Sequence, residues 1–137
     1  IATSNKTATP YAAVEIWANP TVLKTKYTNV VIDGTQAIGL SDGVLQSVDL
    51  ETGNSIWKKG RFGHGQILMV AGVLIVQDED GPIHFLSLQD RGFKELAKVE
   101  AMSDLSWANL CLFDNKLLIR NSIETVCYEL PLSRTND

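Results

Sequence analysis

The segment that decides the fold is Ser47-Val48-Asp49-Leu50-Glu51-Thr52-Gly53-Asn54-Ser55-Ile56-Trp57. It predicts a β-strand, a tight turn at Thr52 and Gly53, and a second strand that carries an indole four residues beyond the glycine. Similar hydrophobic units follow this segment along the chain, and a period of about forty residues is the sequence signature of a repeat architecture. We therefore expect a chain built from repeated β units.

The rest of the chain predicts antiparallel meanders separated by short turns. The expected strands lie at 29–32, 35–40, 44–50 and 55–59 in a first unit, at 66–70, 73–77, 83–88 and 93–99 in a second, and at 108–112, 116–120 and 125–130 in a third. Asp33-Gly34 is the signal of a two-residue type I′ hairpin. The first hairpin turns of the three units fall at Gly34, Gly72 and Asn115, separated by 38 and 43 residues. This even spacing favours propeller blades over a sandwich.

The predicted fold is all-β, a partial β-propeller of about three four-stranded antiparallel meanders. Both hairpin strands of the second unit, Ile67–Val70 and Val73–Val76, are continuously apolar, as is typical of a sheet covered on both faces. We expect the partial propeller at 14–132, with blade units at about 27–60, 61–100 and 101–132 and with a strand at 14–18 from a preceding or closing blade. Residues 1–13 are expected to form a disordered or linker-like segment and residues 133–137 a tail.

The number of blades leaves a question about closure. A closed propeller needs about four blades, so three imply either the tail of a longer chain or copies that associate to complete the ring. Open ends would expose apolar blade faces and favour association.

Composition narrows the classes of partner. The 137 residues are 45% hydrophobic and 20% charged, which is typical of one globular domain. The net charge is -4 and no basic run is present, so a nucleic-acid partner is disfavoured. The longest apolar run, Ile67–Val76, is too short to span a bilayer, so we expect no membrane insertion. Cys111 and Cys127 lie in apolar runs and are expected to be buried thiols, although their spacing also allows a disulfide.

The segment 47–57 resembles the tryptophan-docking motif of pyrroloquinoline-quinone-type β-propellers, Ala-x-Asp-x-x-Thr-Gly-x-x-x-Trp, with Ser47 in place of the alanine. The residues that carry the motif are Asp49, Thr52, Gly53 and Trp57. Physically, Asp49 can accept backbone amides of the turn, and Gly53 can supply a positive φ. Trp57 is expected to spread its ring over the adjacent blade.

The resemblance extends to most of the chain. Segments 23–31, 61–66, 118–121 and 127–131 look like the carboxy-terminal blades of bacterial quinoprotein-like repeat proteins. The sequence also departs from that pattern. Trp17 occupies a docking position, but Ala13 and Thr9 stand where glycine and aspartate would be, and the second unit has no tryptophan at 89–93.

The resemblance implies a function without chemistry of its own. The expectation is a non-catalytic scaffold or interaction module of an exported protein, periplasmic or secreted, whose partners are the remaining blades, a second copy of the chain or another protein. The alternative is a segment of a quinone-dependent oxidoreductase whose catalytic residues lie in missing blades. Such enzymes use an adjacent cysteine pair, and Cys111 and Cys127 are not adjacent. We therefore expect no catalytic residue and no cofactor for this chain, pyrroloquinoline quinone being implied only by the resemblance.

One stretch is a candidate ligand site. His64 lies between Gly63 and Gly65, which permit close backbone approach, and Arg61 and Gln66 are near it in sequence. These side chains can recognise an anionic or quinone-like group near the propeller axis. The alternative is that His64 hydrogen-bonds a neighbouring blade.

Lys24 is a further candidate, since Lys24, Lys26 and Tyr27 form a basic-aromatic patch that can hold a carboxylate or can simply be a solvated loop. The remaining polar residues predict structure. Asp78-Glu79-Asp80 lacks the spaced ligands of a calcium loop and reads as an acidic hairpin turn. His84 alone in its strand indicates no metal site. Trp107 is expected in blade packing and Arg120 in an inter-blade hydrogen bond.

Overall fold

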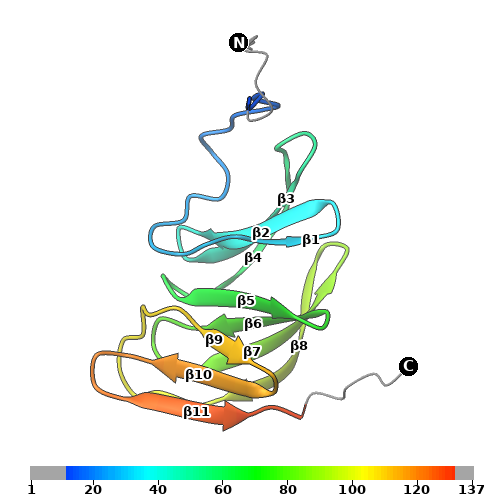
Figure 1. Cartoon of the computed structure of the whole chain (residues 1–137). Coiled ribbons are helices and arrows are strands. Elements are labelled where there is room, and N and C mark those ends of the chain that lie inside the picture. Colours follow the sequence, from blue (N-terminus) through cyan, green and yellow to red (C-terminus); the bar gives the residue numbers. More distant parts are fainter. Residues whose placement is uncertain (1–11, 132–137) are drawn as a thin grey trace.

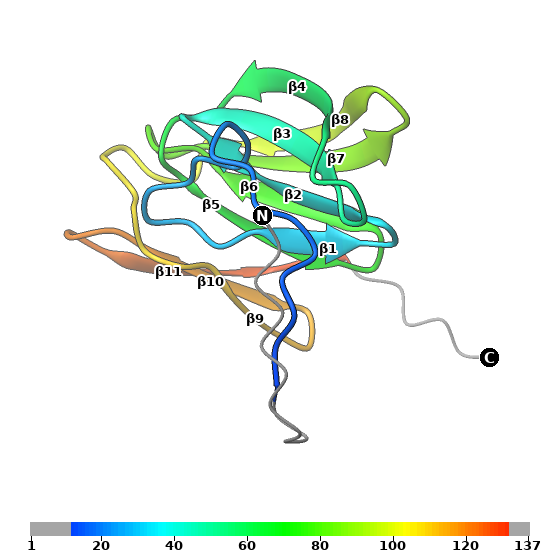
Figure 2. The same ribbon diagram turned by 90° about the horizontal axis from the view of Figure 1, so that it is seen from above.

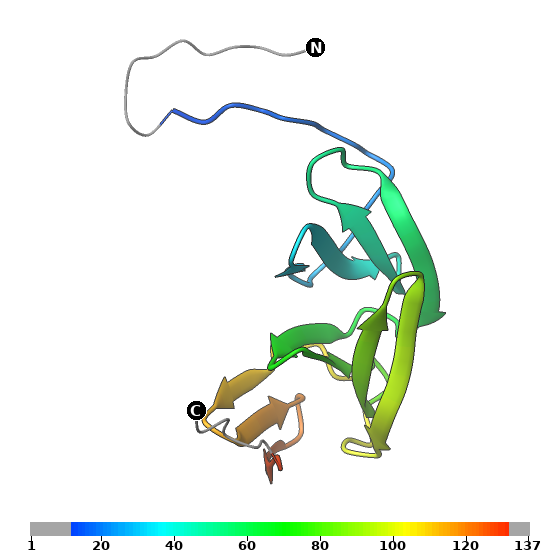
Figure 3. The same cartoon turned by 90° about the vertical axis from the view of Figure 1, so that its right-hand side faces the viewer.

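A computed structural model describes residues 12–131 of the chain. Within that range eleven strands form three antiparallel sheets, and there is no helix (Figure 1). The prediction of an all-β chain of blade-like meanders is confirmed. The three blades follow one another in chain order and the two ends of the series do not meet, as Figures 1 and 3 show.

The first two sheets are complete four-stranded meanders. The first holds β1 (Val31–Asp33), β2 (Gln36–Ser41), β3 (Val44–Asp49) and β4 (Ser55–Arg61), hydrogen-bonded in that order. The second holds β5 (Gln66–Val70), β6 (Val73–Gln77), β7 (Ile83–Gln89) and β8 (Gly92–Val99), again in chain order.

The third sheet has three strands, β9 (Cys111–Phe113), β10 (Lys116–Arg120) and β11 (Thr125–Glu129). β11 is an edge strand, in the position where the other two sheets continue into β4 and β8. These are the three strands that the sequence predicts for the third unit.

Tight hairpins set the register of the meanders. The loops at Asp42-Gly43 and Ala71-Gly72 have positive φ at both residues, as a type I′ turn requires. The first hairpin differs from the prediction. Asp33 pairs with Gln36, so the loop is Gly34-Thr35 and only Gly34 has a positive φ, which matches a type II′ turn.

Two hydrophobic clusters join the sheets face to face. The first cluster lies between the first and second sheets and contains Ile38, Leu40, Leu45 and Trp57 from one, with Ile67, Leu74, Val76 and Leu86 from the other. The second lies between the second and third sheets and includes Ile75, Ile83, Leu117, Ile119 and Leu130. Because strands β5 to β7 contribute to both clusters, the second sheet is covered on both faces, as its continuous apolar runs predict.

The expected strand at 14–18 is absent from the structure. The chain there joins no ladder, and it runs away from the sheets as an extended segment in Figures 1 and 2. The physical reason is that a fourth strand needs a third strand beside it to accept its backbone hydrogen bonds, and the described residues supply none at this end. Thr9 lies outside the described residues.

The cysteine prediction is also wrong. Cys111 and Cys127 are exposed free thiols, not buried ones. Both pair with Leu118 of the central strand β10, from opposite sides. Their Cα atoms are therefore two strand spacings apart, about 9.6 Å, which is beyond the reach of a disulfide. Among residues 12–131, no helix offers an apolar stretch long enough to cross a membrane.

Candidate functional site

The turn of the segment 47–57 is a docking point for an indole, but the indole belongs to Trp17. The Trp17 ring lies against Gly53, and its Nε1 donates a hydrogen bond to the Leu50 carbonyl at 2.7 Å. A Cβ at position 53 would come within 2.6 Å of the indole Cδ2 and Cε3 atoms. Glycine is therefore required twice, for this close approach and for its φ of 74°. The expected docking role of Trp17 holds even though its segment is not a strand.

Asp49 fixes the conformation of that turn. Its Oδ1 accepts the backbone N–H groups of Glu51 at 2.8 Å and Thr52 at 2.9 Å. These hydrogen bonds, with that of Thr52 the largest cause, lower the pKa of the Asp49 carboxyl below its ordinary value. Thr52 Oγ1 in turn accepts the N–H of Asn54 at 3.3 Å. Asp49, Thr52 and Gly53 thus hold the platform on which Trp17 rests.

Trp57 packs between the first and second sheets, as expected. It is 7% exposed, and its ring centroid lies 6.2 Å from that of Phe93 at the start of β8. Phe93 directly follows Gly92, so Trp57 packs beside the turn between β7 and β8, although a Cβ at Gly92 would meet Lys59 and not Trp57. The Trp57 Nε1 has no hydrogen-bond partner among the described residues. The contact is therefore hydrophobic and aromatic, without the carbonyl bond that Trp17 makes.

The candidate residue His64 lies beside Glu79, a carboxylate that accepts hydrogen bonds from two different segments. Glu79 accepts the His64 backbone N–H at 3.1 Å and the Trp107 indole N–H at 2.8 Å. The Trp107 and His64 hydrogen bonds, followed by the charges of His64 and Lys26, hold the pKa of Glu79 below its ordinary value. Sequence reasoning assigned Glu79 only to an acidic turn and did not bring it next to His64 or Trp107.

Gln66 is structural rather than available to a ligand. It is 3% exposed, and its Nε2 donates to the carbonyls of Trp107 at 2.9 Å and Tyr27 at 3.3 Å. Thr28 makes a parallel connection, since its hydroxyl donates to the Gly65 carbonyl at 2.7 Å. These hydrogen bonds join three segments that lie outside the sheets, at 27–28, at Gly65 and at Trp107, next to His64.

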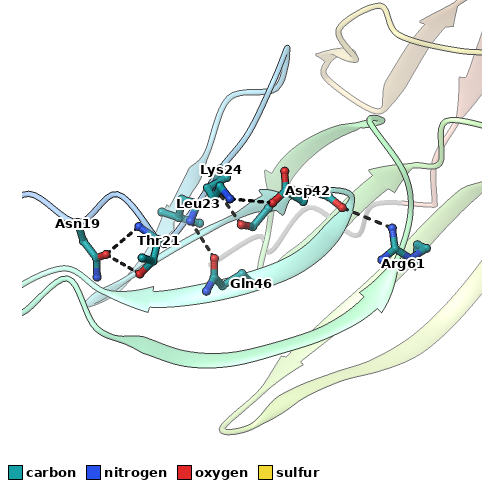
Figure 4. A network of polar contacts seen from close by, with 8 residues as sticks. Asn19, Thr21, Leu23, Lys24, Asp42, Gln46 and Arg61 are labelled. Atoms are coloured by element: carbon teal, nitrogen blue, oxygen red, sulfur yellow. Dashed lines mark hydrogen bonds and ion pairs between the residues drawn. The ribbon is translucent and has the colours of Figure 1, made fainter.

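Arg61 and Lys24 belong to a separate network, shown in Figure 4. Lys24 Nζ lies 3.4 Å from the Asp42 carboxylate, and Arg61 Nη1 donates to the Asp42 carbonyl at 3.4 Å. Two backbone bonds also hold the segment that carries Lys24. The Leu23 N–H donates to Gln46 Oε1 at 2.8 Å, and the Lys24 N–H donates to Ser41 Oγ at 3.0 Å. The four candidates thus divide into two groups, with His64 and Gln66 around Glu79 and Lys24 and Arg61 around Asp42.

Trp107 and Arg120 have other environments than expected, and His84 has two carboxylate neighbours. Trp107 is 54% exposed and contacts Glu79, so it is not a blade-packing residue. Arg120 is exposed on β10 and lines a shallow surface hollow with Asn121 and Ser122. His84 is buried, with Nδ1 2.9 Å from Glu95 Oε1, Nε2 3.6 Å from Asp78 Oδ2 and its ring edge on Phe62.

The outer face of the third sheet is open to solvent. Along β10 the side chains alternate, with Leu117 and Ile119 buried against the second sheet and Lys116, Leu118 and Arg120 exposed on the other face. The apolar members of this outer face are Cys111, Phe113, Leu118 and Cys127, all exposed. The outer face of the first sheet differs, because Ala37, Ser41, Gln46 and Val48 there are buried.

An apolar groove of about 360 Å³ opens between the second and third sheets, next to β11. Its walls come from β6, β7 and β8 on one side and from β10 and β11 on the other, and they include Phe85, Leu96, Val99, Tyr128 and Leu130. Leu96 is 53% exposed within it. The groove offers shape and hydrophobic surface with few polar groups, which suits an apolar side chain better than a charged ligand.

The comparisons with known proteins concern the fold. No protein-family model matches the sequence, and no curated protein matches it. A solved structure that resembles the chain is the crystal structure of the computationally designed Ika8 protein, with a TM-score of 0.57 and 12% sequence identity. The match covers 74% of this chain and 32% of the Ika8 chain, so this chain spans about a third of the length of the structure it matches. At this identity the likeness shows the fold alone.

Both carboxylate oxygens of Glu79 accept hydrogen bonds, one from the Trp107 indole and one from the His64 backbone. Among residues 12–131, no group of three or more potential metal ligands occurs. The third sheet combines three exposed features, which are its outer face, the edge of β11 and the apolar groove beside that edge.

Proposed function

We propose that this chain is a non-catalytic β-propeller scaffold or interaction module of an exported bacterial quinoprotein-like protein. The observation that carries the proposal is the exposed outer face of the third sheet, with Phe113 80% and Leu118 42% exposed. Contiguous apolar side chains on a sheet face are typical of an interaction site. Such a face lies where the next blade of a propeller would pack, so the partner is further blades, a second copy or another protein.

The exported and bacterial parts of the proposal depend on the resemblance of segment 47–57 to the docking motif of quinoprotein-like propellers. The Trp17–Gly53 contact supports that interpretation, because an indole rests on the motif glycine and bonds the carbonyl of Leu50. A repeat of this kind is compatible with a scaffold on which partners assemble.

A quinone titration distinguishes the scaffold from an oxidoreductase segment. We expect no bound-quinone absorbance and no dye-linked alcohol oxidation when pyrroloquinoline quinone and Ca²⁺ are added to the chain. A saturable quinone spectrum with turnover would contradict the proposal.

The interaction part is tested in extracts of the producing cell, where the wild-type chain should migrate in an assembly larger than the single chain. The double variant Phe113→Asp/Leu118→Asp should migrate as the single chain, and an unchanged assembly would contradict the role of this face.

A further inference from the structure

The free edge of β11 has the geometry of an acceptor for one more strand. Leu130 N–H donates to the Asn115 carbonyl at 2.7 Å, and Asn121 N–H donates to that of Glu124 at 3.0 Å. In an antiparallel ladder, hydrogen-bonded and non-hydrogen-bonded pairs alternate. The alternation therefore directs the N–H and C=O groups of Thr125, Cys127 and Glu129 away from β10, toward the position that β4 and β8 occupy in the other sheets.

The opposite end of the chain carries the complementary element. Trp57 of β4 packs on Phe93 beside the turn between β7 and β8. Trp17 packs beside the corresponding turn of the first sheet, between β3 and β4, where it contacts Gly53 and bonds the Leu50 carbonyl. Residues 12–18 therefore stand, relative to the first sheet, where the fourth strand of a preceding sheet would stand. In the described part of the chain no such sheet is present behind them, and Val14 and Ile16 are 71% and 82% exposed.

We propose that residues 12–18 of a second copy of this chain add to the edge of β11 as the fourth strand of the third sheet. This inference rests on the proposed function, because both treat the third sheet as a docking surface. In an extended strand, side chains alternate between the two faces. Trp17 faces its own first sheet, so Val14 and Ile16 face the other way, toward the second sheet of the acceptor copy. That is where the apolar groove between the second and third sheets opens beside β11.

The donor comes from a second copy because of where the two elements lie. Figures 1 and 3 show residues 12–18 at the end of the molecule formed by the first sheet and β11 at the end formed by the third. Trp17, anchored on Gly53, keeps the donor at its own end. A contact between these unlike ends is heterologous, so each copy has one donor and one acceptor.

Two variants separate the donor from the acceptor. Val14→Asp/Ile16→Asp places charge on the two side chains that enter the groove, and Leu96→Asp places charge in the groove wall. All three positions are exposed in the single chain, so the fold should be retained, as far-ultraviolet circular dichroism can verify. Leu105→Asp is the matched control, since Leu105 is 46% exposed but lies in the connection between β8 and β9 and does not line the groove.

Sedimentation velocity of the purified chain over a micromolar-to-millimolar series provides the measurement. We expect the wild type and Leu105→Asp to associate with increasing concentration, and we expect the donor variant and the acceptor variant, each alone, to remain monomeric. An equimolar mixture of these two variants should form a heterodimer and nothing larger, because one retains an intact acceptor and the other an intact donor.

A wild-type chain that stays monomeric over the series would overturn the inference. So would association that survives in either single variant, or a mixture that stays monomeric although the wild type associates. None of these outcomes affects the quinone titration or the assembly seen in cell extracts, so failure of the inference is distinguishable from failure of the proposed function.

Discussion

Trp17 and Gly53 are 36 positions apart in sequence and in direct contact, the indole lying so close to the glycine that a Cβ there would overlap the ring. The contact fastens an otherwise unpaired segment to the first sheet, together with the 2.7 Å bond from Trp17 to the Leu50 carbonyl. Asn19 adds a further bond, donating from Nδ2 to the Gly53 carbonyl at 2.9 Å. The glycine of the turn thus connects the repeat motif to the chain that precedes it.

Gly53→Ala should be strongly destabilising, because the added Cβ meets both a φ of 74° and the Trp17 ring. Gly34→Ala is the matched control, since Gly34 has a φ of 61° but nothing within 4 Å of its Cβ position. We expect the control to cost about 1 kcal/mol of unfolding free energy and Gly53→Ala to cost more. In a Trp17→Ala background the two substitutions should become equal in urea denaturation. A difference that persists there would show that the ring is not responsible.

Trp57→Ala should remove a buried aromatic side chain from the cluster between the first and second sheets. The expected loss is about 3–5 kcal/mol of unfolding free energy, the usual cost of truncating a buried Trp. Trp107→Ala is the comparison, because that ring is 54% exposed and lies outside both clusters. Equal losses for the two variants in chemical denaturation would contradict the burial of Trp57.

The strands that sequence analysis placed best are those bounded by tight turns on both sides. β5, β6 and β10 have the predicted limits, because a glycine or Asp-Asn turn separates short apolar runs there. The error at 14–18 has a different origin. Alternating side chains predict that a segment can be a strand, but a strand also needs a neighbour, and a local pattern contains no information about the neighbour.

The same limit applies to the faces of the third sheet and to the candidate site. In Leu110-Cys111-Leu112 every residue is apolar, so alternation does not reveal that Cys111 faces outward on a sheet with no blade beyond it. His64 and Glu79 are 15 positions apart, and only the stacking of strands brings them together. The acidic run 78–80 can be recognised in the sequence. That Glu79 is bonded, however, depends on Trp107, which lies 28 positions further along the chain.

Glu79 should stabilise the fold in a pH-dependent way. Its folded-state pKa lies below that of the unfolded chain, where a glutamate titrates near pH 4.3. The stabilisation is therefore present above that pH and is lost as the pH falls through the lower folded-state pKa. We expect the difference in unfolding free energy between wild type and Glu79→Gln to be largest at neutral pH and to shrink in acid. Trp107→Phe, which removes the indole donor but keeps the carboxylate, should weaken this pH dependence. An equal pH dependence in Trp107→Phe would show that the 2.8 Å bond is not its main cause.

Both cysteines should react with a thiol reagent in the native state. Cys111 and Cys127 are exposed and are separated by the central strand β10, so neither burial nor a disulfide protects them. We expect Ellman's reagent to titrate both thiols of the folded chain without denaturant, and Cys127→Ser to reduce the count by one. Thiols that react only after unfolding, or only after reduction, would contradict the exposed, unpaired state.

The loop at His64 gives the clearest test of whether its residues serve structure or binding. The His64 backbone N–H bonds Glu79, but no hydrogen bond of its imidazole is among the contacts of the described residues. Its neighbour Gly65 is packed so tightly against the Gln77 carbonyl that a Cβ would overlap it. His64→Ala should therefore change the unfolding free energy by no more than about 0.5 kcal/mol. Gly65→Ala should cost about 1–3 kcal/mol because the backbone has to move. Thermal unfolding of the two variants decides the question. If His64→Ala proves as destabilising as Gly65→Ala, the imidazole is a structural part of the loop and His64 is no longer a ligand candidate.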